Sequence, residues 1–69
     1  MQNIDKSIGA KIKQLRLHKR YSREQLGRKL GVCQQQIEKY EIGENRISAA
    51  MLMDMAKIFN IQVQSFYDE

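Results

Sequence analysis

The sequence has few of the residues that small proteins use to reinforce a fold. Its 69 residues include one cysteine, one histidine and no proline. A single cysteine excludes an intramolecular disulfide and fits a reducing compartment. With His18 as its only companion, Cys33 has no metal-ligand spacing around it, and we expect no metal. A domain of this size buries only about 60% of its unfolded surface, so oligomerisation is the stabilising aid that stays open.

Long hydrophobic runs are also missing. No apolar stretch approaches the roughly 20 residues that span a bilayer, and the beginning MQNIDKSIGAK lacks the apolar block of a signal peptide. The absence of proline and of low-complexity tracts argues against a linker. We therefore expect a single cytoplasmic domain over residues 1–69. We also expect no room for a ligand-sensing domain, so that regulation would come from concentration, dimerisation or a partner.

The residues of a catalytic site are equally scarce. No carboxylates are paired in an apolar setting, no phosphate-binding loop is present, and no acid–base or nucleophilic group can be assembled from one histidine and one cysteine. We expect neither an enzyme nor a cofactor.

Basic residues, by contrast, are concentrated in the first half of the chain. Up to Gly31 there are nine basic and two acidic residues, a net charge of +7, and the remainder carries −3. Nucleic acid or an anionic membrane surface would explain this concentration. A solvated helix face would explain it equally well, so charge alone does not decide between them.

Apolar residues at helical spacing, bounded by capping residues, predict a chain of short helices. The first runs from about Asp5, its expected N-cap, to Lys19. The second begins at Ser22, where Ser22 and Gln25 match a capping box and Tyr21 and Leu26 a hydrophobic staple. It ends at Gly31, which can take a left-handed conformation.

Three further helices are expected after this turn. One follows Cys33, runs to about Glu41 and ends before Gly43. The next lies between its cap Ser48 and the terminating residue Asn60, with an apolar stripe of Leu52, Met55, Ala56 and Phe59. The alternating end IQVQSFY would suit a strand, but a strand has no partner here, so we expect a short fifth helix over 63–67.

Residues 22–41 form a unit of two short helices. A three-residue turn containing Gly31 joins them, which describes a helix-turn-helix. Gly27 is small enough for a second helix to cross closely. Apolar residues stand where the two helices must pack, at Leu26, Leu30, Val32 and Ile37.

The second helix of this unit begins with three glutamines. If Ile37 is at the centre of the buried face, a rotation of about 100° per residue points Gln35 and Lys39 away from the core. Gln36 and Glu38 flank them. A glutamine amide can both donate and accept at adenine N6 and N7 in the major groove. Within a helix-turn-helix that follows a basic segment, we favour base reading over a merely solvated surface.

The stretch SREQLGRKLGVCQQQIEKYEIGENRIS resembles the Xre/Cro-type helix-turn-helix of bacterial and phage transcriptional regulators. The resemblance extends from IGAKIKQLR to LMDMAKIFNIQVQSFY. It implies an all-α, compact five-helix, lambda-repressor-like domain whose third helix enters the major groove of double-stranded DNA. It further implies a nucleoid-associated regulator, which we expect to be a repressor, commonly acting as a homodimer on a palindromic operator.

The resemblance also implies roles for individual residues. The positions that match base readers are Gln34, Gln35 and Lys39, with Gln36 at the edge. The positions that match contacts to the DNA backbone are Arg23, Asn45, Arg46 and Ser48. Arg16 and Glu41 match an ion pair that ties the first helix to the third, and we interpret them as structural.

Three residues depart from the family pattern. Cys33 replaces the usual Ser or Thr cap, which weakens the cap by some tenths to ~1 kcal/mol; it is either redox-sensitive or, as we prefer, a small residue that fits. Gly27 replaces the commoner alanine and costs up to ~1 kcal/mol of helix propensity. Glu38 either accepts a hydrogen bond from cytosine N4 or points past the DNA.

Two other functions stay open. The basic amphipathic first helix would suit a peptide of the membrane surface, although capped helices and turn glycines argue against it. The stronger alternative is an antitoxin-like or adaptor module whose main partner is another protein. The methionines and Phe66-Tyr67 would then form its docking surface, whereas we prefer them as core and dimer interface.

Overall fold

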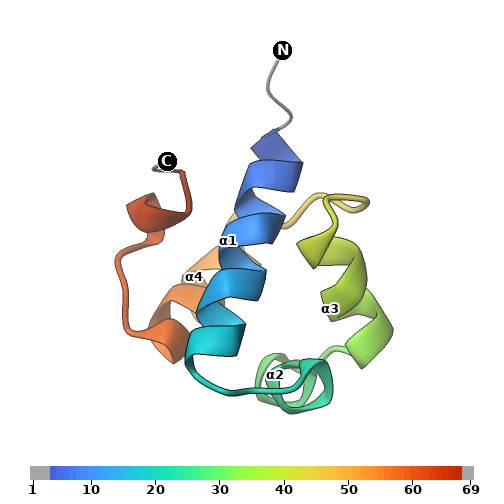
Figure 1. Ribbon diagram of the computed structural model, residues 1–69. Helices are drawn as coiled ribbons and strands as arrows, with labels where there is room; N and C mark the ends of the chain where they lie inside the picture. Colours follow the sequence, from blue (N-terminus) through green and yellow to red (C-terminus); the bar gives the residue numbers. More distant parts are fainter. Residues whose placement is uncertain (1–3, 68–69) are drawn as a thin grey trace.

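The computed structural model describes residues 4–67, which form four α-helices and one short 3-10 helix (Figure 1). In chain order they are α1 (Ile4–His18), α2 (Arg23–Leu30), α3 (Gln34–Glu41), α4 (Ala49–Phe59) and η1 (Val63–Phe66). No strand occurs in this part of the chain. The predicted all-α class is confirmed, and the predicted count of five helices is wrong because only four α-helices form.

The segment expected to be the fifth helix is a single 3-10 turn. Its backbone hydrogen bonds join residues three apart, from Ser65 N to Gln62 O and from Tyr67 N to Gln64 O, each at 3.0 Å. Four residues are too few to offset the entropy of nucleating an α-helix, so the tighter turn forms instead. The buried ring of Phe66 fixes this turn against the core.

Side-chain caps start two of the helices as predicted. At α2, Gln25 N donates to Ser22 Oγ at 3.0 Å and Ser22 N donates to Gln25 Oε1 at 2.8 Å, which completes the capping box. At α4, Met51 N donates to Ser48 Oγ at 3.1 Å. Each cap satisfies an amide that has no partner inside its helix.

The helix ends follow the prediction at two places and differ at a third. Gly31 ends α2 with φ 75°, and Asn60 ends α4 with φ 56°, both in the left-handed region. Asp5, expected to be the N-cap of the first helix, lies inside the first turn of α1, which begins at Ile4. There its carboxylate interacts favourably with the positive end of the helix dipole.

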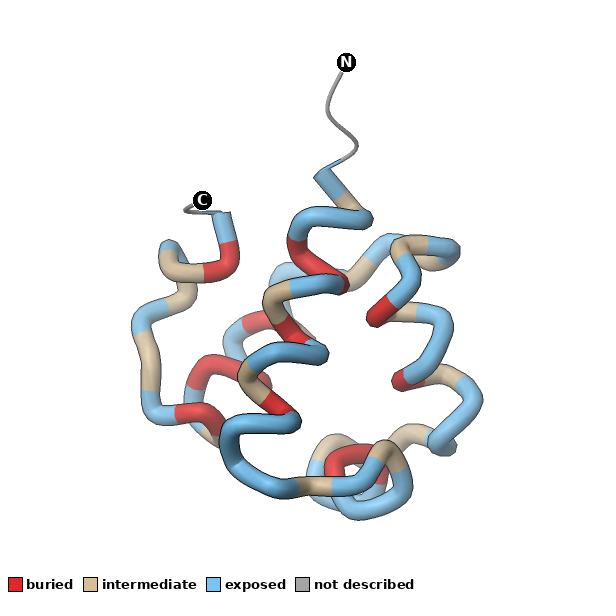
Figure 2. Tube along the Cα trace, viewed as in Figure 1, coloured by how far each residue is buried: buried red, intermediate tan, exposed pale blue. Residues whose placement is uncertain are grey.

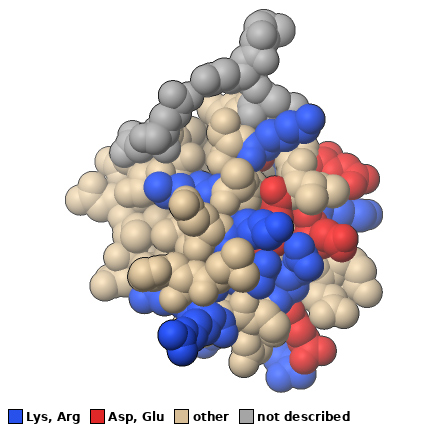
Figure 3. All heavy atoms as spheres, in the orientation of Figure 1, with Lys and Arg blue, Asp and Glu red and all other residues tan. Residues whose placement is uncertain are grey.

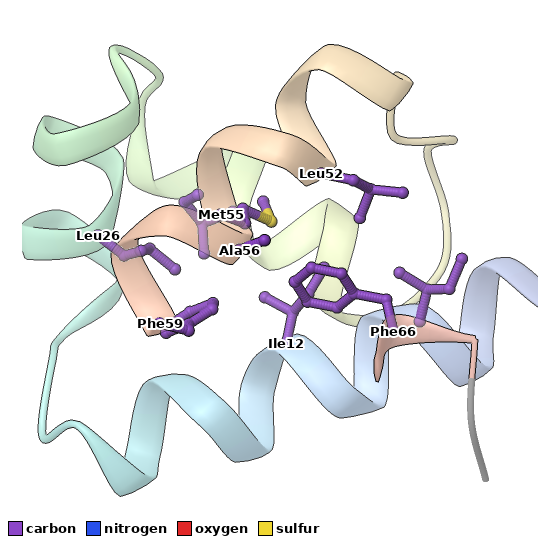
Figure 4. Close-up of a cluster of buried hydrophobic side chains, with 9 residues drawn as sticks. Ile12, Leu26, Leu52, Met55, Ala56, Phe59 and Phe66 are labelled. Atoms are coloured by element: carbon purple, nitrogen blue, oxygen red, sulfur yellow. The ribbon is translucent and has the colours of Figure 1, made fainter. Parts of the chain in front are cut away.

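One hydrophobic core holds the elements together. In Figure 1, α1 crosses in front of α4, with α3 on one side and η1 on the other. The buried residues lie on the faces turned toward this centre (Figure 2), and Figure 4 shows side chains from several elements meeting there. They are Ile8, Ile12, Leu26, Ile37, Leu52, Met55, Ala56, Phe59 and Phe66. The predicted stripe of α4 is thus confirmed, as is the core placement of Met55 and Phe66.

Two glycines let α1 approach the end of α3 closely. A Cβ on Gly9 would lie 2.5 Å from the Glu41 carbonyl oxygen and closer still to that of Tyr40. A Cβ on Gly43, just after α3, would lie 2.7 Å from Lys6 Cα. The sequence pattern predicts no packing role for either residue. Together they fix the carboxyl end of α3 against α1, which sets how far its other end projects.

Candidate nucleic-acid interface

The α3 helix is buried on its inner face and open on its outer face. Ile37 is fully buried against the core, and Glu41 is buried at the last turn. On the outer face Gln34, Gln35, Glu38 and Lys39 are exposed, while Gln36 is half-buried. This agrees with the rotation predicted from Ile37 for Gln35 and Lys39. The same rotation of about 100° per residue would turn Gln34 toward the inner side, but Gln34 is exposed. The helix therefore offers two amides, a carboxylate and an ammonium group on one surface.

A tight turn sets the direction in which α3 leaves α2. Val32 N donates to Gly27 O at 2.9 Å, and a Cβ on Gly27 would lie 2.5 Å from the Val32 carbonyl oxygen. Gly27 was expected to let a second helix cross closely. The close approach is present, but its partner is the backbone of the turn that leads into α3. An alanine here would need that backbone to shift, so helix propensity alone misjudges the position.

The cap of α3 is incomplete. Cys33 has the extended backbone of an N-cap, with φ −76° and ψ 160°, but its side chain accepts no cap hydrogen bond. Its carbonyl oxygen still accepts from Gln36 N at 3.1 Å. The thiol is free and exposed. The first turn of α3 thus begins without the side-chain oxygen that α2 and α4 both have.

A groove runs between the start of α2 and the outer face of α3. Its lining consists of polar and charged side chains from α1, the α2 cap, α2 and α3: Arg16, Ser22, Arg23, Gln34, Gln35 and Glu38. The groove brings together two of the predicted base readers and one predicted backbone contact. Lys39 and Gln36 are not among its lining residues and lie around the helix from it.

Behind this groove, Glu41 joins the ends of three helices. Its carboxylate accepts from Arg16 Nε at 2.6 Å and Arg16 Nη2 at 3.3 Å, and from Arg23 Nε at 3.1 Å. Arg16 also donates from Nη1 to the Tyr21 carbonyl oxygen at 2.9 Å. The predicted pairing of Arg16 with Glu41 is therefore present as a charge-assisted contact. The end of α1, the start of α2 and the end of α3 meet at one carboxylate.

Burial makes this cluster sensitive to the loss of any member. The Glu41 side chain is 1% exposed and that of Arg16 is 8% exposed, so each charge depends on its partner for the solvation it has lost. Arg23 differs because its side chain is 39% exposed at the groove. Two guanidinium groups share one carboxylate, which leaves a surplus positive charge beside the outer face of α3.

The second partner of Glu41 was missed by sequence reasoning. Arg23 was predicted only as a contact to the DNA backbone, and its attachment to Glu41 crosses 18 residues of chain. No local spacing indicates such a contact, since it depends on how α2 packs against the end of α3. Once the fold is known, the contact can be expected, because a buried glutamate then lies near two helix ends that both carry an arginine.

The remaining predicted backbone contacts lie in the connection from α3 to α4. Arg46 is exposed, and its Nε is 3.8 Å from Asp5 Oδ1, beside the start of α1. Ser48 is exposed and its hydroxyl already accepts the α4 cap hydrogen bond. Asn45 is half-buried. None of the three lines the groove between α2 and α3, so any contact they make with DNA would flank it.

Charge is unevenly distributed over the surface. Figure 3 shows basic side chains spread over α1 and α2, while the acidic ones in this view lie toward the side of α3. The separation follows from the net charge of +7 up to Gly31 and −3 beyond it. A polyanion would therefore be attracted mainly by α1 and α2.

Residues 4–67 offer neither a metal-ligand cluster nor a membrane-spanning helix. No group of three or more His, Cys, Asp or Glu side chains there could hold a metal ion. Within the same residues, none of the helices combines the length and the apolar character needed to cross a bilayer.

The arrangement of α2 and α3 agrees with the comparison to known proteins. A family model described as helix-turn-helix matches residues 12–66, which include α2, the turn, α3 and α4. The chain belongs to the Xre-type helix-turn-helix family. The family suggested by the motif is thereby confirmed, and its members include proteins named as transcriptional regulators.

Three relatives of this Xre-type domain illustrate the match. A protein of Rhodospirillum rubrum, named as an uncharacterized transcriptional regulator in the ATPase CF(0) region, is 38% identical over 69 residues and covers all of this chain. Uncharacterized helix-turn-helix-type transcriptional regulators are 39% identical over 66 residues in Sinorhizobium medicae and 41% identical over 68 residues in Rickettsia conorii, covering 96% and 99% of the chain. This Xre-type chain spans only 64%, 48% and 54% of those three proteins.

Proposed function

We propose that this Xre-type domain is a sequence-specific, double-stranded DNA-binding transcriptional regulator that reads the major groove with α3. The observation that carries the proposal is the outer face of α3. Its exposed polar side chains stand opposite an inner face fixed by Ile37 and by the buried Glu41 cluster. A rigid helix with free hydrogen-bonding groups along one side is the element that base readout in the major groove needs.

The chemistry of the exposed side chains suits base edges. Gln34 and Gln35 each offer an amide that matches adenine N6 and N7, and Lys39 offers an ammonium group that matches guanine O6 and N7. Gln36 is half-buried at the edge of this surface, where its reach is shorter. We assign Gln34, Gln35 and Lys39 as the main readers of sequence, with Gln36 in a minor role.

Contacts to phosphate would hold the helix in register. Arg23 borders the groove with its side chain partly exposed, and Arg46 and Ser48 are exposed on the connection to α4. We assign these three and Asn45 to the DNA backbone. Such contacts add affinity and salt dependence without carrying sequence information themselves.

One copy of α3 covers only a short half-site. We propose that two copies bind a two-fold symmetric operator as a homodimer and act as a repressor in the cytoplasm, associated with the nucleoid. In this mode the spacing of the half-sites, about one turn of DNA, would mirror the spacing of the two α3 helices.

Selection from a randomised duplex library at physiological salt tests the proposal. The expected result is enrichment of a two-fold symmetric site whose half-sites are about one helical turn apart. Enrichment of a site without symmetry would support base reading and contradict binding as a homodimer. If nothing is enriched while the protein still binds DNA at low salt, charge alone holds it there and the specific function is wrong.

An antitoxin-like or adaptor role is favoured by a second, more apolar depression. It lies at the start of α1 and is lined by Ile4, Asp5, Ile8, Arg46, Ile47, Leu52 and Tyr67. Ile4 and Tyr67 are each 54% exposed there, so two large apolar side chains lie open at the same depression. A failed DNA selection combined with stable binding of a partner protein that is lost on Tyr67→Ala would favour this role.

A further inference from the structure

Glu38 stands among the predicted base readers. It is exposed on the outer face of α3 and lines the same groove as Gln34 and Gln35. It follows them by four and three residues, which places its side chain about one helical turn further along the same strip. A side chain at this place faces whatever occupies the groove.

The carboxylate of Glu38 has no partner within residues 4–67. No hydrogen bond or ion pair of its side chain occurs there, and the two arginines of the groove, Arg16 and Arg23, are both held by Glu41. Lys39 follows it in sequence, but a rotation of about 100° turns that ammonium group to the other side of the outer face. Glu38 therefore offers an unpaired negative charge in an otherwise amide-lined and basic groove.

An unpaired carboxylate against DNA is unfavourable unless it meets a hydrogen-bond donor. Phosphates repel it, and guanine O6 and N7 and thymine O4 are all acceptors. Adenine N6 donates, but its neighbour N7 is an acceptor that repels a second carboxylate oxygen. Cytosine N4 is the donor in the major groove that a carboxylate matches best.

We propose that Glu38 is a further base-reading residue, which accepts a hydrogen bond from N4 of a cytosine in each half-site. This assignment rests on the proposed DNA-reading function of α3 and adds to it a preference that the glutamines do not supply. Three residues of helix rise about 4.5 Å, compared with about 3.4 Å per base pair. The cytosine is therefore expected one or two base pairs from the base that Gln35 contacts.

The test crosses variants of the protein with variants of the site. Sites are first selected with the unaltered chain, and the enriched cytosine is then replaced by thymine in the duplex. Dissociation constants are measured on both duplexes for the unaltered chain, Glu38→Ala and Glu38→Gln. Asp54→Asn is the matched control, since it removes one exposed carboxylate from α4, outside the groove. Thermal unfolding of each variant checks that its fold is kept.

The unaltered chain should bind the cytosine duplex more tightly than the thymine duplex, on the order of tenfold. Thymine presents O4, an acceptor, in place of the cytosine N4 donor, so the Glu38 carboxylate would lose its hydrogen bond there. Glu38→Ala should lose this preference, Glu38→Gln should reduce it, and Asp54→Asn should keep it. The same preference in Glu38→Ala would overturn the assignment and show that Glu38 points past the DNA. Selection that enriches no site with the unaltered chain would instead refute the proposed function, and this assignment with it.

Discussion

At Cys33, the identity of one side chain decides whether the start of α3 has a side-chain cap. Its backbone angles, φ −76° and ψ 160°, nearly equal those of the caps Ser22 and Ser48, at φ −76°, ψ 165° and φ −67°, ψ 155°. Both serines accept a hydrogen bond from the amide three residues on, and the thiol accepts none. The backbone geometry for a cap is therefore complete at Cys33. Only the side-chain acceptor is missing, and Gln36 N donates to the Cys33 carbonyl oxygen at 3.1 Å instead.

Replacing Cys33 with serine should stabilise the protein. We expect Cys33→Ser to raise the free energy of unfolding by about 0.5–1 kcal/mol, since the hydroxyl can accept from Gln36 N without a change of backbone. Urea unfolding measures the difference. Cys33→Ala is the control, because it removes the thiol without supplying an acceptor. Equal stabilities of the serine and alanine variants would show that the cap position is not limiting.

Replacing Gln35 tests base reading at a single residue. Gln35→Ala should weaken binding to the selected site by ~1–3 kcal/mol while changing binding to random duplexes little, because an amide on a base edge contributes only at the right base. Titrations on both duplexes measure this, with Gln14→Ala, an exposed glutamine of α1, as the control. Equal losses on the two duplexes would remove Gln35 from the base readers.

At the scale of elements, the backbones of α1 and of the end of α3 lie so close that no side chain fits between them at Gly9. Gly9→Ala should lower the free energy of unfolding by about 1–3 kcal/mol, because its methyl group would meet the carbonyl oxygens of Tyr40 and Glu41. Alanine's better helix propensity, about 1 kcal/mol, offsets only part of this. Ser7→Ala, on the exposed face of α1, is the control. A Gly9→Ala protein as stable as the unaltered chain would mean that α1 can move away from α3.

The Glu41 cluster joins the same elements by charge. Glu41→Ala should cost about 3–5 kcal/mol, because it leaves the buried guanidinium of Arg16 without its counter-ion. That loss approaches the whole stability of a small domain, typically about 5 kcal/mol or more. Circular dichroism and thermal unfolding should therefore show a largely unfolded protein. Glu44→Ala, which removes an exposed carboxylate, should stay within about 0.5 kcal/mol. A native-like transition for Glu41→Ala would contradict a structural role for the cluster.

Much of the element pattern could be predicted from the sequence because it is encoded locally. The caps Ser22 and Ser48 and the left-handed ends Gly31 and Asn60 act within a few residues of their position. Asp5 was expected to be the cap but lies just inside the first turn, because an acidic residue is favourable at both places. The last helix was misjudged because hydrophobic spacing does not distinguish a 3-10 turn from an α-helix over four residues.

The site was only partly predictable, and the missing parts depend on tertiary packing. The outward direction of Gln35 and Lys39 follows from rotation around α3 once Ile37 is placed inside. The link from Arg23 to Glu41 and the contacts of Gly9 and Gly43 do not, since they join residues from 18 to more than 30 positions apart. A glycine inside a helix indicates close packing, but the partner backbone is known only from the fold.

At the scale of the whole molecule, binding should be salt-dependent through contacts outside the groove. Arg46→Ala should weaken binding to all sequences alike and reduce the slope of log affinity against log salt by about 1, since a phosphate contact carries no base preference. Measurements at several salt concentrations on selected and random duplexes check this. Lys57→Ala removes the same charge from α4 and should change the slope less. An unchanged slope would remove Arg46 from the phosphate contacts.

The separation of charge along the chain would also assign the association rate and the dissociation rate of a DNA complex to different halves of the fold. If the chain binds DNA as proposed, the basic residues of α1 and α2 would attract it over a Debye length, so they would set the rate of encounter and orient the molecule as it arrives. In the proposed binding mode, the nearly neutral outer face of α3 would contribute after arrival and would set how long the complex lasts. Loss of a basic side chain such as Lys29 would then slow association, and loss of Gln35 would speed dissociation. Search and recognition would thus be properties of different segments, open to separate adjustment by mutation.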